Sequence, residues 1–254
     1  MRRYWVSKEK FEAGIVKIEG EDFRHICKVC RRNIGHRFEV LSEDHKAYFV
    51  EIVELGKNEA VAKVLEERVL PELPKPHIHL ALSLPKFQTL ERVLEKSVEL
   101  GAHSLHLFSS DYSFMKPKAL ELKKKQARWG KIIKGATQQT GRGTLMELTE
   151  IKPLGVLLEE FSLQKNAYGL CAFEGEGQLS LKMALNQVGS EAESLWVFVG
   201  SEGGFSQEDL KLFNNYKLLP VSLGDQVLRV ETACVTLLSI LKYGVGHFDK
   251  IEEN

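Results

Sequence analysis

The sequence predicts an α/β protein, with a mostly parallel sheet covered by helices on both faces and a small β-rich domain at the N-terminus. From residue 77 onward, short apolar stretches rich in β-branched residues alternate with longer amphipathic stretches, which is typical of a parallel sheet. Residues 4–70 hold several short β-branched stretches separated by turn residues, and this pattern favours a small β-barrel. Residues 71–76 carry three of the seven prolines. Because proline fixes φ and lacks a backbone donor, we expect a linker there, between a barrel of residues 1–70 and an α/β domain of residues 77–254.

Four strands and one helix are expected in the barrel. The strands fall at residues 14–18, 37–41, 47–55 and 60–65. Residues 22–32 favour a short helix, because apolar residues recur there at three-to-four spacing, at Phe23, Ile26, Cys27 and Cys30. Cys27 and Cys30 have the spacing of half a zinc or redox site, but no second such pair follows. We therefore interpret both cysteines as small core residues.

The α/β domain is expected to alternate strands with helices. Strands are expected at residues 77–84, 104–108, 168–173, 196–200 and just before residue 223. Helices are expected at residues 90–98, 117–140, from 206 onward and from about 231. Gly101 is placed to end the first of these helices, since glycine readily adopts the left-handed conformation that follows a helix.

Composition narrows the classes of function. The 35 lysines and arginines balance 35 aspartates and glutamates, and this neutral sum counts against a strongly basic nucleic-acid protein. The first ten residues lack the apolar core of a secretory signal, and no apolar run is long enough to span a membrane. Four cysteines are too few for a disulfide framework in a chain of 254 residues. We therefore expect a cytoplasmic protein that makes no membrane contact.

Basic residues are nevertheless clustered in two regions. Residues 116–134 carry eight lysines and arginines against one acid, Glu121. The N-terminal domain adds Arg2, Arg3, Lys28, Arg31, Arg32 and Arg37. A single cluster of this kind is often a solvated helix face. Two clusters in two domains favour contacts with the phosphates of a nucleic acid.

The strongest candidate site is a pair of strand ends near the C-terminus. The strand ending at Gly200 is followed by the turn Ser201–Gly204 and by Ser206, whose acidic neighbours suit a helix N-cap. A second strand ends near Leu223, and a glycine turn at Gly224 leads into the last helix. Because ligands bind at the carboxyl ends of parallel strands, the two turns predict a ligand site.

Other chemistries lack their motifs. The sequence has no phosphate-binding loop, no dinucleotide fingerprint after its first strand and no serine-hydrolase elbow. Four histidines lie in or beside two strands, His77, His79, His103 and His106. Their arrangement does not match a zinc site of known geometry. We interpret them as strand-end histidines in a polar setting, and we expect no metal.

The two turns resemble the signature of a known family. Gly200–Ser206 with Glu208, followed by Leu223–Ala233, closely resembles the signature of the RsmE-type 16S rRNA (uracil-N3)-methyltransferases, which belong to the SPOUT class of knotted methyltransferases. Three further segments are similar to family segments, Glu95–Ala102, Ala136–Arg142 and His25–Arg31. The chain departs from the usual family residues at Cys30, Gln138, Ser201, Gln226 and Val230.

The resemblance implies a fold and an activity. It implies a C-terminal α/β domain tied in a trefoil knot, a PUA-like N-terminal barrel that binds RNA, and a homodimer. The implied reaction is the S-adenosylmethionine-dependent methylation of N3 of one uridine in small-subunit ribosomal RNA. Two alternatives stay open. One is a ribose 2′-O-methyltransferase of the SpoU type acting on rRNA or tRNA, and the other is a non-catalytic RNA-binding assembly factor.

The resemblance also suggests roles for individual residues. The cofactor would be held by Cys171, Ala172, Phe173, Gly200, Ser201, Glu202, Gly203, Leu223, Gly224, Val227, Leu228, Arg229, Thr232 and Ala233. Arg229 would stabilise negative charge on the uracil, and Glu231 or else Glu202 would accept its proton. RNA would be bound by Arg2, Arg3, Arg24, Lys28, Arg31, Arg32, Lys86, Lys123, Lys124, Arg128 and Arg142.

Overall fold

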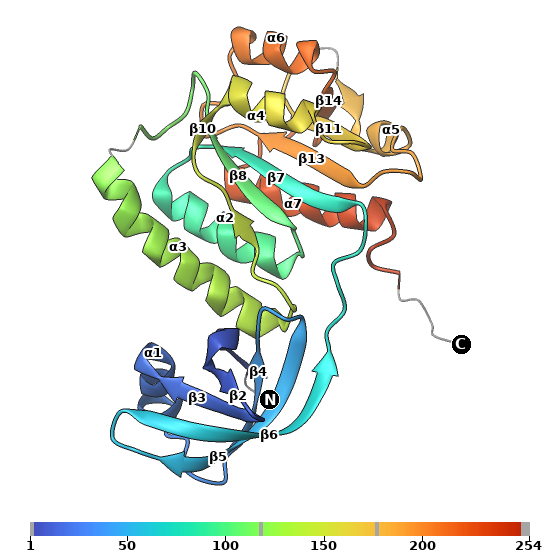
Figure 1. The fold of residues 1–254 in the computed structure, drawn as a ribbon. Helices are drawn as coiled ribbons and strands as arrows, with labels where there is room; N and C mark the ends of the chain where they lie inside the picture. Colours follow the sequence, from blue (N-terminus) through green and yellow to red (C-terminus); the bar gives the residue numbers. More distant parts are fainter. Residues whose placement is uncertain (1–2, 117–118, 176–177, 250–254) are drawn as a thin grey trace. The chain divides into compact units, whose positions relative to one another are not determined.

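A computed structural model describes residues 3–116, 119–175 and 178–249 (Figure 1). The chain divides into two compact units. The first comprises Met1–Glu72 together with Lys134–Leu145, and the second comprises Leu73–Ile133 together with Met146–Asn254. No described helix is both long enough and apolar enough to cross a membrane.

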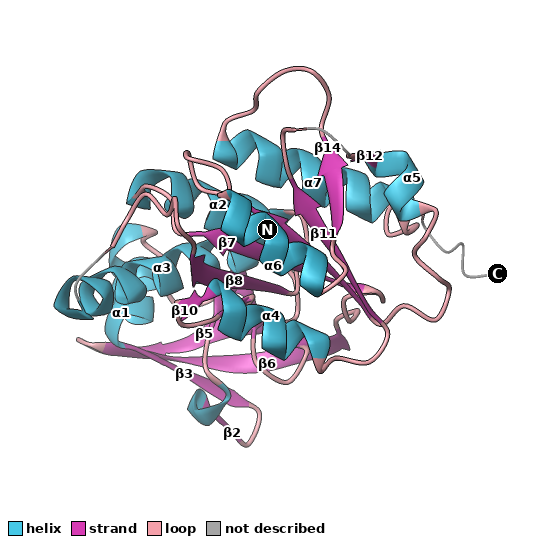
Figure 2. Cartoon of the chain, turned by 90° about the horizontal axis from the view of Figure 1, so that it is seen from above, coloured by secondary structure: helices cyan, strands magenta, loops and turns pink. Residues whose placement is uncertain are grey.

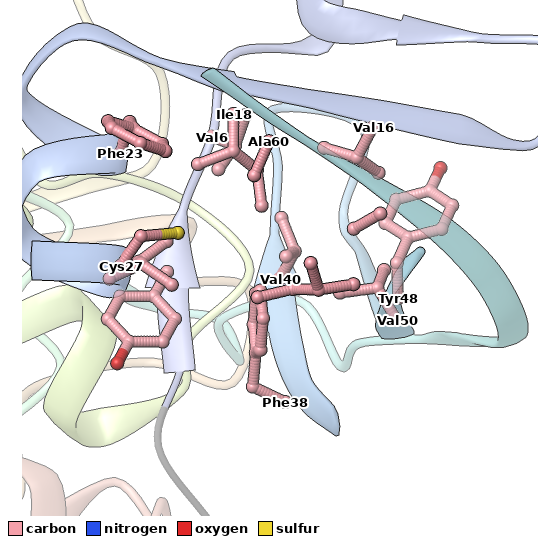
Figure 3. Close-up of a cluster of buried hydrophobic side chains, with 14 residues drawn as sticks. Val6, Val16, Ile18, Phe23, Cys27, Phe38, Val40, Tyr48, Val50 and Ala60 are labelled. Carbon is pink, nitrogen blue, oxygen red and sulfur yellow. The ribbon is translucent and has the colours of Figure 1, made fainter. Parts of the chain in front are cut away.

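The first unit is built on a six-stranded sheet. Its strand order is β1-β4-β5-β6-β3-β2, with bounds β1 Arg3–Trp5, β2 Phe11–Glu12, β3 Ile15–Glu19, β4 Arg37–Leu41, β5 Lys46–Leu55 and β6 Glu59–Val69. The four expected strands are therefore confirmed as β3 to β6. Alternate residues of β3, Val16 and Ile18, are fully buried, because side chains along a strand point to opposite faces. Figure 3 shows them packed with Phe23 and Phe38 in the core of this unit.

The helix expected at residues 22–32 is shorter and irregular. A single α-turn, α1 (Gly20–Phe23), leads into a π-helical segment, η2 (Arg24–Val29). Cys27 is buried in the core, as predicted, and burial raises the pKa of its thiol. The prediction is wrong for Cys30, which is only half-buried, with its Sγ 3.8 Å from His25 Nε2. The helix stops before it because Arg31 takes a left-handed φ of 51°.

Residues 134–145 belong to the first unit, although the sequence-based division placed them in the α/β domain. Two polar contacts link them to the barrel strands and to α1. Lys134 forms an ion pair with Asp22 at 2.9 Å, and Arg3 donates a hydrogen bond to the carbonyl of Gln139 at 3.4 Å. Sequence periodicity detects that these residues are helical, but not which core they contact.

The second unit holds an eight-stranded sheet whose paired strands all run parallel, as predicted. The order is β10-β8-β7-β13-β11-β14-β12, with β9 beside β8. The strands are β7 His77–Ser83, β8 Ser104–Ser109, β9 Glu147–Leu148, β10 Lys152–Pro153, β11 Ala167–Ala172, β12 Leu179–Ser180, β13 Ser194–Val199 and β14 Leu219–Ser222. All six residues of β13 are buried, which explains why its sequence is continuously apolar.

Helices cover both faces of this sheet, as Figures 1 and 2 show. The helices of this part of the chain are α2 Phe87–Glu99, α3 Ala119–Thr140, α4 Leu154–Ser162, α5 Leu181–Leu185, α6 Gln207–Asn215 and α7 Val230–Gly244. Of these, α3 contacts α2 through Trp129 and Phe87. Side chains of α4 and α6 pack on the face that carries Trp196 and Phe198, while α2 and α7 lie together on the other side. The expected helices are confirmed as α2, α3, α6 and α7, and α4 and α5 were not predicted.

The histidines of β7 and β8 are more buried than a polar strand end would be. His79 and His106 are each only 9% exposed and lie against the Trp196 ring, with centroid distances of 4.7 and 4.3 Å. The Ser104 hydroxyl lies 2.6 Å from a nitrogen of each ring, so it can donate to one histidine and accept from the other. Burial lowers the pKa of His79 to about 3 and of His106 to about 4. Both rings are therefore neutral near pH 7. No cluster able to hold a metal occurs in the described part of the chain.

Candidate active site

A cavity of about 910 Å³ opens at the carboxyl ends of the central strands of the second unit. Three loops contribute to its wall, and they follow β11, β13 and β14. Because β11 pairs with both β13 and β14, the three loops leave the same edge of the sheet side by side. The starts of α2 and α7 complete the lining. The volume lies within the range of pockets that bind small molecules and cofactors.

The turn after β13 requires glycine at two positions. A β-carbon at Gly200 would lie 2.9 Å from the Cα of Gly204, which is closer than real β-carbons approach other atoms. Gly204 has a φ of 70° and donates its N–H to the carbonyl of Ser201 at 3.0 Å. The tight turn expected at this strand end is therefore confirmed. It exposes the backbone of residues 200–204 to the cavity.

Helix α6 starts directly after this turn, with Ser206 as its N-cap. The Ser206 hydroxyl accepts a hydrogen bond from the N–H of Asp209, and the Asp209 carboxylate accepts one from the N–H of Ser206, both at 3.0 Å. This reciprocal pair is a capping box, which satisfies two backbone donors at the helix start. The predicted N-cap is confirmed, and it fixes where the turn ends.

The loop after β14 forms another part of the wall. Gly224 takes a φ of 102°, and its N–H donates to the Ser222 hydroxyl at 3.1 Å. The loop then runs past Val227, which is 80% exposed, to Arg229. Helix α7 begins at Val230, and Arg229 occupies its N-cap position without a side-chain cap. The Arg229 side chain is exposed, and it forms no ion pair with a described residue.

Residues at and near the start of helix α2 donate hydrogen bonds to both acidic candidates, Glu202 and Glu231. Glu202 accepts hydrogen bonds from the N–H of Lys86 and the hydroxyl of Thr89, both at 3.3 Å. Glu231 accepts one from Arg92 at 3.1 Å. A carboxylate at a helix N-terminus is favoured by the helix dipole, so Glu202 stabilises the start of α2 and is fixed by it. The lining holds three cationic side chains and three acidic ones, namely Lys86, Arg92 and Arg229 with Glu174, Glu202 and Glu231, so the charges of the cavity balance.

Sequence reasoning missed most of the contribution of α2, namely Gln88, Thr89 and Arg92. A signal was present, because β7 is a central strand and its carboxyl end lies at the same edge as the glycine turns. The helix that follows such a strand begins at that edge. The further unpredicted lining residues are Glu174, Val199, Gly204, Phe205, Val221, Gln226 and Val230.

Twelve of the fourteen residues expected to hold the cofactor line this cavity. Cys171 does not, because it is 1% exposed within the core under α4 and α6. Burial raises the pKa of its thiol to about 12. Thr232 does not line the cavity either, since it lies on an exposed part of the first turn of α7. Its neighbours Glu231 and Ala233 face the cavity instead. The three catalytic candidates, Arg229, Glu231 and Glu202, are all in the lining.

The basic residues expected to bind RNA differ in accessibility. In the first unit Arg24, Lys28 and Arg31 are exposed and Arg32 is half-buried. Arg3 forms an ion pair with the buried Glu39 at 2.7 Å, which Arg68 also contacts. Burial would raise the pKa of Glu39, but the hydrogen bonds from Arg68 and Arg3 hold it below its usual value. Burial lowers the pKa of Arg142 to about 10. Arg2 lies outside the described residues.

In the second unit the expected RNA contacts lie around α2 and α3. Lys123 and Lys124 are exposed on α3, and Lys86 lines the cavity. Arg128 instead forms two hydrogen bonds with Glu91, at 2.5 and 2.7 Å. Two of the expected RNA contacts, Arg3 and Arg128, therefore pair with carboxylates of the protein itself, and Arg142 is half-buried. The charged groups of Lys123 and Lys124 are exposed to solvent.

Comparisons with known proteins agree along nearly the whole chain. Residues 71–242 match the RNA methyltransferase domain family, and residues 18–65 match the RNA methyltransferase PUA domain. The chain is 30% identical over 250 residues to ribosomal RNA small subunit methyltransferase E of Bacillus subtilis, covering 96% of each chain. It is 31% identical over 227 residues to the enzyme of that name from Helicobacter pylori, covering 89% of this chain and 93% of the other.

Solved structures give the same result. The solved structure of a putative methyltransferase from Legionella pneumophila, in complex with the cofactor S-adenosylmethionine, superposes with a TM-score of 0.85 at 26% identity. The superposition covers 95% of this chain and 96% of the other. Both units of the fold are therefore shared with that protein.

Proposed function

Since the chain belongs to the RsmE-type family of small-subunit ribosomal RNA methyltransferases, we propose that it transfers the methyl group of S-adenosylmethionine to N3 of a uridine in 16S rRNA. The observation that carries this proposal is the cavity at the ends of β11, β13 and β14. It places two glycine turns, Arg229 and two carboxylates around one space. We further propose that the enzyme works in the cytoplasm and that it is a homodimer. Sedimentation of the purified protein would test the oligomeric state.

The cavity suits S-adenosylmethionine in shape and in charge. Its glycine turn leaves backbone groups uncovered, because Gly200 and Gly203 have no side chains to cover them and a β-carbon at Gly200 would meet Gly204. Backbone N–H and C=O groups at such a turn can hydrogen-bond the edges of an adenine. The three cationic and three acidic lining side chains suit a ligand that bears an ammonium, a sulfonium and a carboxylate. We assign the loops after β11, β13 and β14 to holding it.

The chemistry demands deprotonation of the uracil. The N3–H of uracil is about as acidic as a tyrosine hydroxyl, so little of the nucleophilic anion exists near pH 7. S-adenosylmethionine, when bound, supplies an electrophilic methyl group on a positively charged sulfur. The protein must accept the N3 proton, stabilise charge spreading onto O2 and O4, and hold N3 in line with the methyl group.

We assign charge stabilisation to Arg229 and proton acceptance to Glu231, with Glu202 as the second candidate. Arg229 is exposed in the cavity lining and has no ion pair among the described residues, so its guanidinium is available to a substrate. Glu231 stands two residues further on, in the first turn of α7. Its partner, Arg92, has a 66% exposed side chain and can move away. Glu202 is held by two donors at the start of α2, which suits an orienting role better.

The reaction class is tested by the position of the label in the RNA. Small-subunit rRNA is incubated with the protein and methyl-labelled S-adenosylmethionine, then digested to nucleosides and analysed by mass spectrometry. Label in 3-methyluridine supports the proposal. Label on a ribose oxygen would assign the protein to the 2′-O-methyltransferases. No transfer combined with no cofactor binding by calorimetry would assign it to the non-catalytic RNA-binding factors.

Exposed lysines on α3 are expected to contact RNA phosphates. Changing Lys123→Glu and Lys124→Glu should weaken RNA binding. The slope of log affinity against log salt should fall by about 0.7 for each phosphate of a single-stranded RNA that is no longer neutralised. Exposed lysines outside this segment provide the matched control, Lys165→Glu with Lys182→Glu. The two double variants carry the same change in net charge. An equal effect of both on the salt slope would contradict a localised phosphate contact.

A further inference from the structure

Two aromatic rings stand exposed on the segment that joins β8 to α3. Tyr112 is 53% exposed and Phe114 is 51% exposed. Single exposed apolar residues are common on protein surfaces. These two are only two residues apart, and both lie beside the lining of the cavity. A β-carbon on Gly203 would be 3.0 Å from the Cβ of Tyr112, and Lys86 Nζ lies 4.6 Å from the centre of the Phe114 ring. Gly203 and Lys86 are both lining residues.

The buried side chain of Ser113 anchors this segment through hydrogen bonds. This side chain is 9% exposed, and its hydroxyl accepts a hydrogen bond from the N–H of Ser110 at 2.8 Å and lies 3.0 Å from the Ser83 hydroxyl. The N–H of Phe114 donates to the carbonyl of Leu84 at 3.0 Å. The chain between the two rings is thus fixed to the end of β7.

The segment is also joined to the turn after β13. The Ser201 hydroxyl donates to the carbonyl of Tyr112 at 2.5 Å, and the Ser206 hydroxyl donates to Asp111 at 2.6 Å. The rings therefore do not sit on a loosely attached loop. A ligand that binds them loses less free energy to ordering the protein than it would on a flexible loop.

The surroundings of the rings favour a nucleic acid over a protein. Lys86 and Lys116 are exposed beside or on the segment, and the acid on it, Asp111, is engaged by Ser206. Protein–protein interfaces are depleted in lysine. Sites for single-stranded RNA combine cations for the phosphates with aromatic rings on which bases stack. A uridine that is methylated on N3 must be unpaired, and its neighbours lose stacking partners when it is withdrawn.

Building on the proposed function, we propose that Tyr112 and Phe114 stack on the bases that flank the target uridine. The rings replace the stacking that those bases lose and hold the RNA strand at the mouth of the cavity. Lys86 is placed to contact an adjacent phosphate. This assigns to the β8–α3 segment a binding role for single-stranded RNA, separate from the lysines along α3.

The test measures binding of a synthetic single-stranded oligoribonucleotide of about nine nucleotides with a central uridine, a length within the usual site sizes. Tyr112→Ala with Phe114→Ala removes two stacks and should weaken binding at least about thirtyfold. Tyr112→Phe with Phe114→Tyr keeps two rings and should retain affinity. Phe114→Leu keeps apolar bulk without an aromatic face and should lose part of the affinity.

Phe248 offers a closely matched control. It is also 51% exposed, and Lys242 Nζ lies 4.7 Å from its ring centre, so Phe248→Ala removes an equivalent ring elsewhere on the unit and should leave RNA affinity unchanged. A second oligonucleotide lacks the bases on either side of the uridine. The wild type should bind this second oligonucleotide about as weakly as the double alanine variant binds the first one, because neither complex can form the stacks. Calorimetry with S-adenosylmethionine should give wild-type affinity for every variant, showing that the cavity is intact.

The outcomes separate this inference from the proposed function. Suppose that the wild type methylates rRNA. If the double alanine variant then binds the oligonucleotide as tightly as the wild type binds it, the stacking role is wrong. A variant that loses RNA affinity and also changes its oligomeric state in sedimentation would assign the rings to a protein interface, and overturn the proposal. Failure of the wild type itself to methylate rRNA refutes the proposed function, whatever the rings bind.

Discussion

Replacing Arg229 with alanine is expected to reduce methyl transfer to RNA by about 10²–10³-fold, the usual cost of removing one group that stabilises developing negative charge. The side chain occupies the N-cap position of α7 but makes no capping hydrogen bond, so the change should not destabilise the helix. Arg229→Lys keeps the charge without the planar, two-pronged donor geometry, and should recover part of the rate.

Arg92→Ala provides the comparison. This change removes an equal charge from the same cavity. The Arg92 side chain differs from that of Arg229 in that it forms an ion pair with Glu231, at 3.1 Å. Single-turnover rates at saturating RNA and cofactor separate chemistry from binding, and calorimetry measures cofactor affinity. A wild-type rate for Arg229→Ala with normal cofactor affinity would remove Arg229 from the mechanism. An equal loss in both arginine variants would indicate a general effect of charge in the cavity.

Gly200→Ala is expected to lower the affinity for S-adenosylmethionine about a hundredfold, because the turn after β13 would have to move. The new β-carbon would lie 2.9 Å from Cα, 3.0 Å from the carbonyl carbon and 3.1 Å from the carbonyl oxygen of Gly204. These are backbone atoms, so no side chain can rotate away to relieve the clash. A misplacement of about 1 Å costs about two orders of magnitude in rate at a catalytic site, and we expect a comparable loss of cofactor affinity here.

The control for this variant is Gly130→Ala. Gly130 lies in α3, and a β-carbon there would meet no atom within 4 Å. Removing a glycine from a helix interior should stabilise the protein by about 0.5–1 kcal/mol without changing cofactor binding. Thermal melting curves show whether Gly200→Ala still folds. A folded Gly200→Ala protein with wild-type cofactor affinity would show that the cofactor does not use this turn.

Much of the second unit follows from local sequence patterns. The six buried residues of β13 and the glycine turn after it are dictated by neighbours in the chain, as is the capping box of Ser206. Strand–helix alternation determines that the sheet is parallel, and parallel strands bring their carboxyl ends to one edge. These elements were predicted for that reason.

Other features depend on contacts between distant residues. Nothing in the sequence around Thr89 and Arg92 indicates that they meet Glu202 and Glu231, which lie more than a hundred residues away. Cys171 was assigned to the cofactor together with its neighbours Ala172 and Phe173, at the end of β11. Whether its side chain faces the cavity or the core depends on register, and a shift of one residue reverses the answer. The irregular end of η2 at Arg31 likewise has no local signature, since arginine seldom adopts a left-handed φ.

The hydrogen bonds from Ser201 and Ser206 to the β8–α3 segment have a thermodynamic consequence. They join the proposed cofactor turn to the proposed RNA-stacking segment, so a ligand that restrains one also restrains the other. Two ligands linked in this way are reciprocal: whatever factor the cofactor contributes to RNA affinity, RNA contributes to cofactor affinity. The donors are two serine hydroxyls, so such a coupling would need no change of fold.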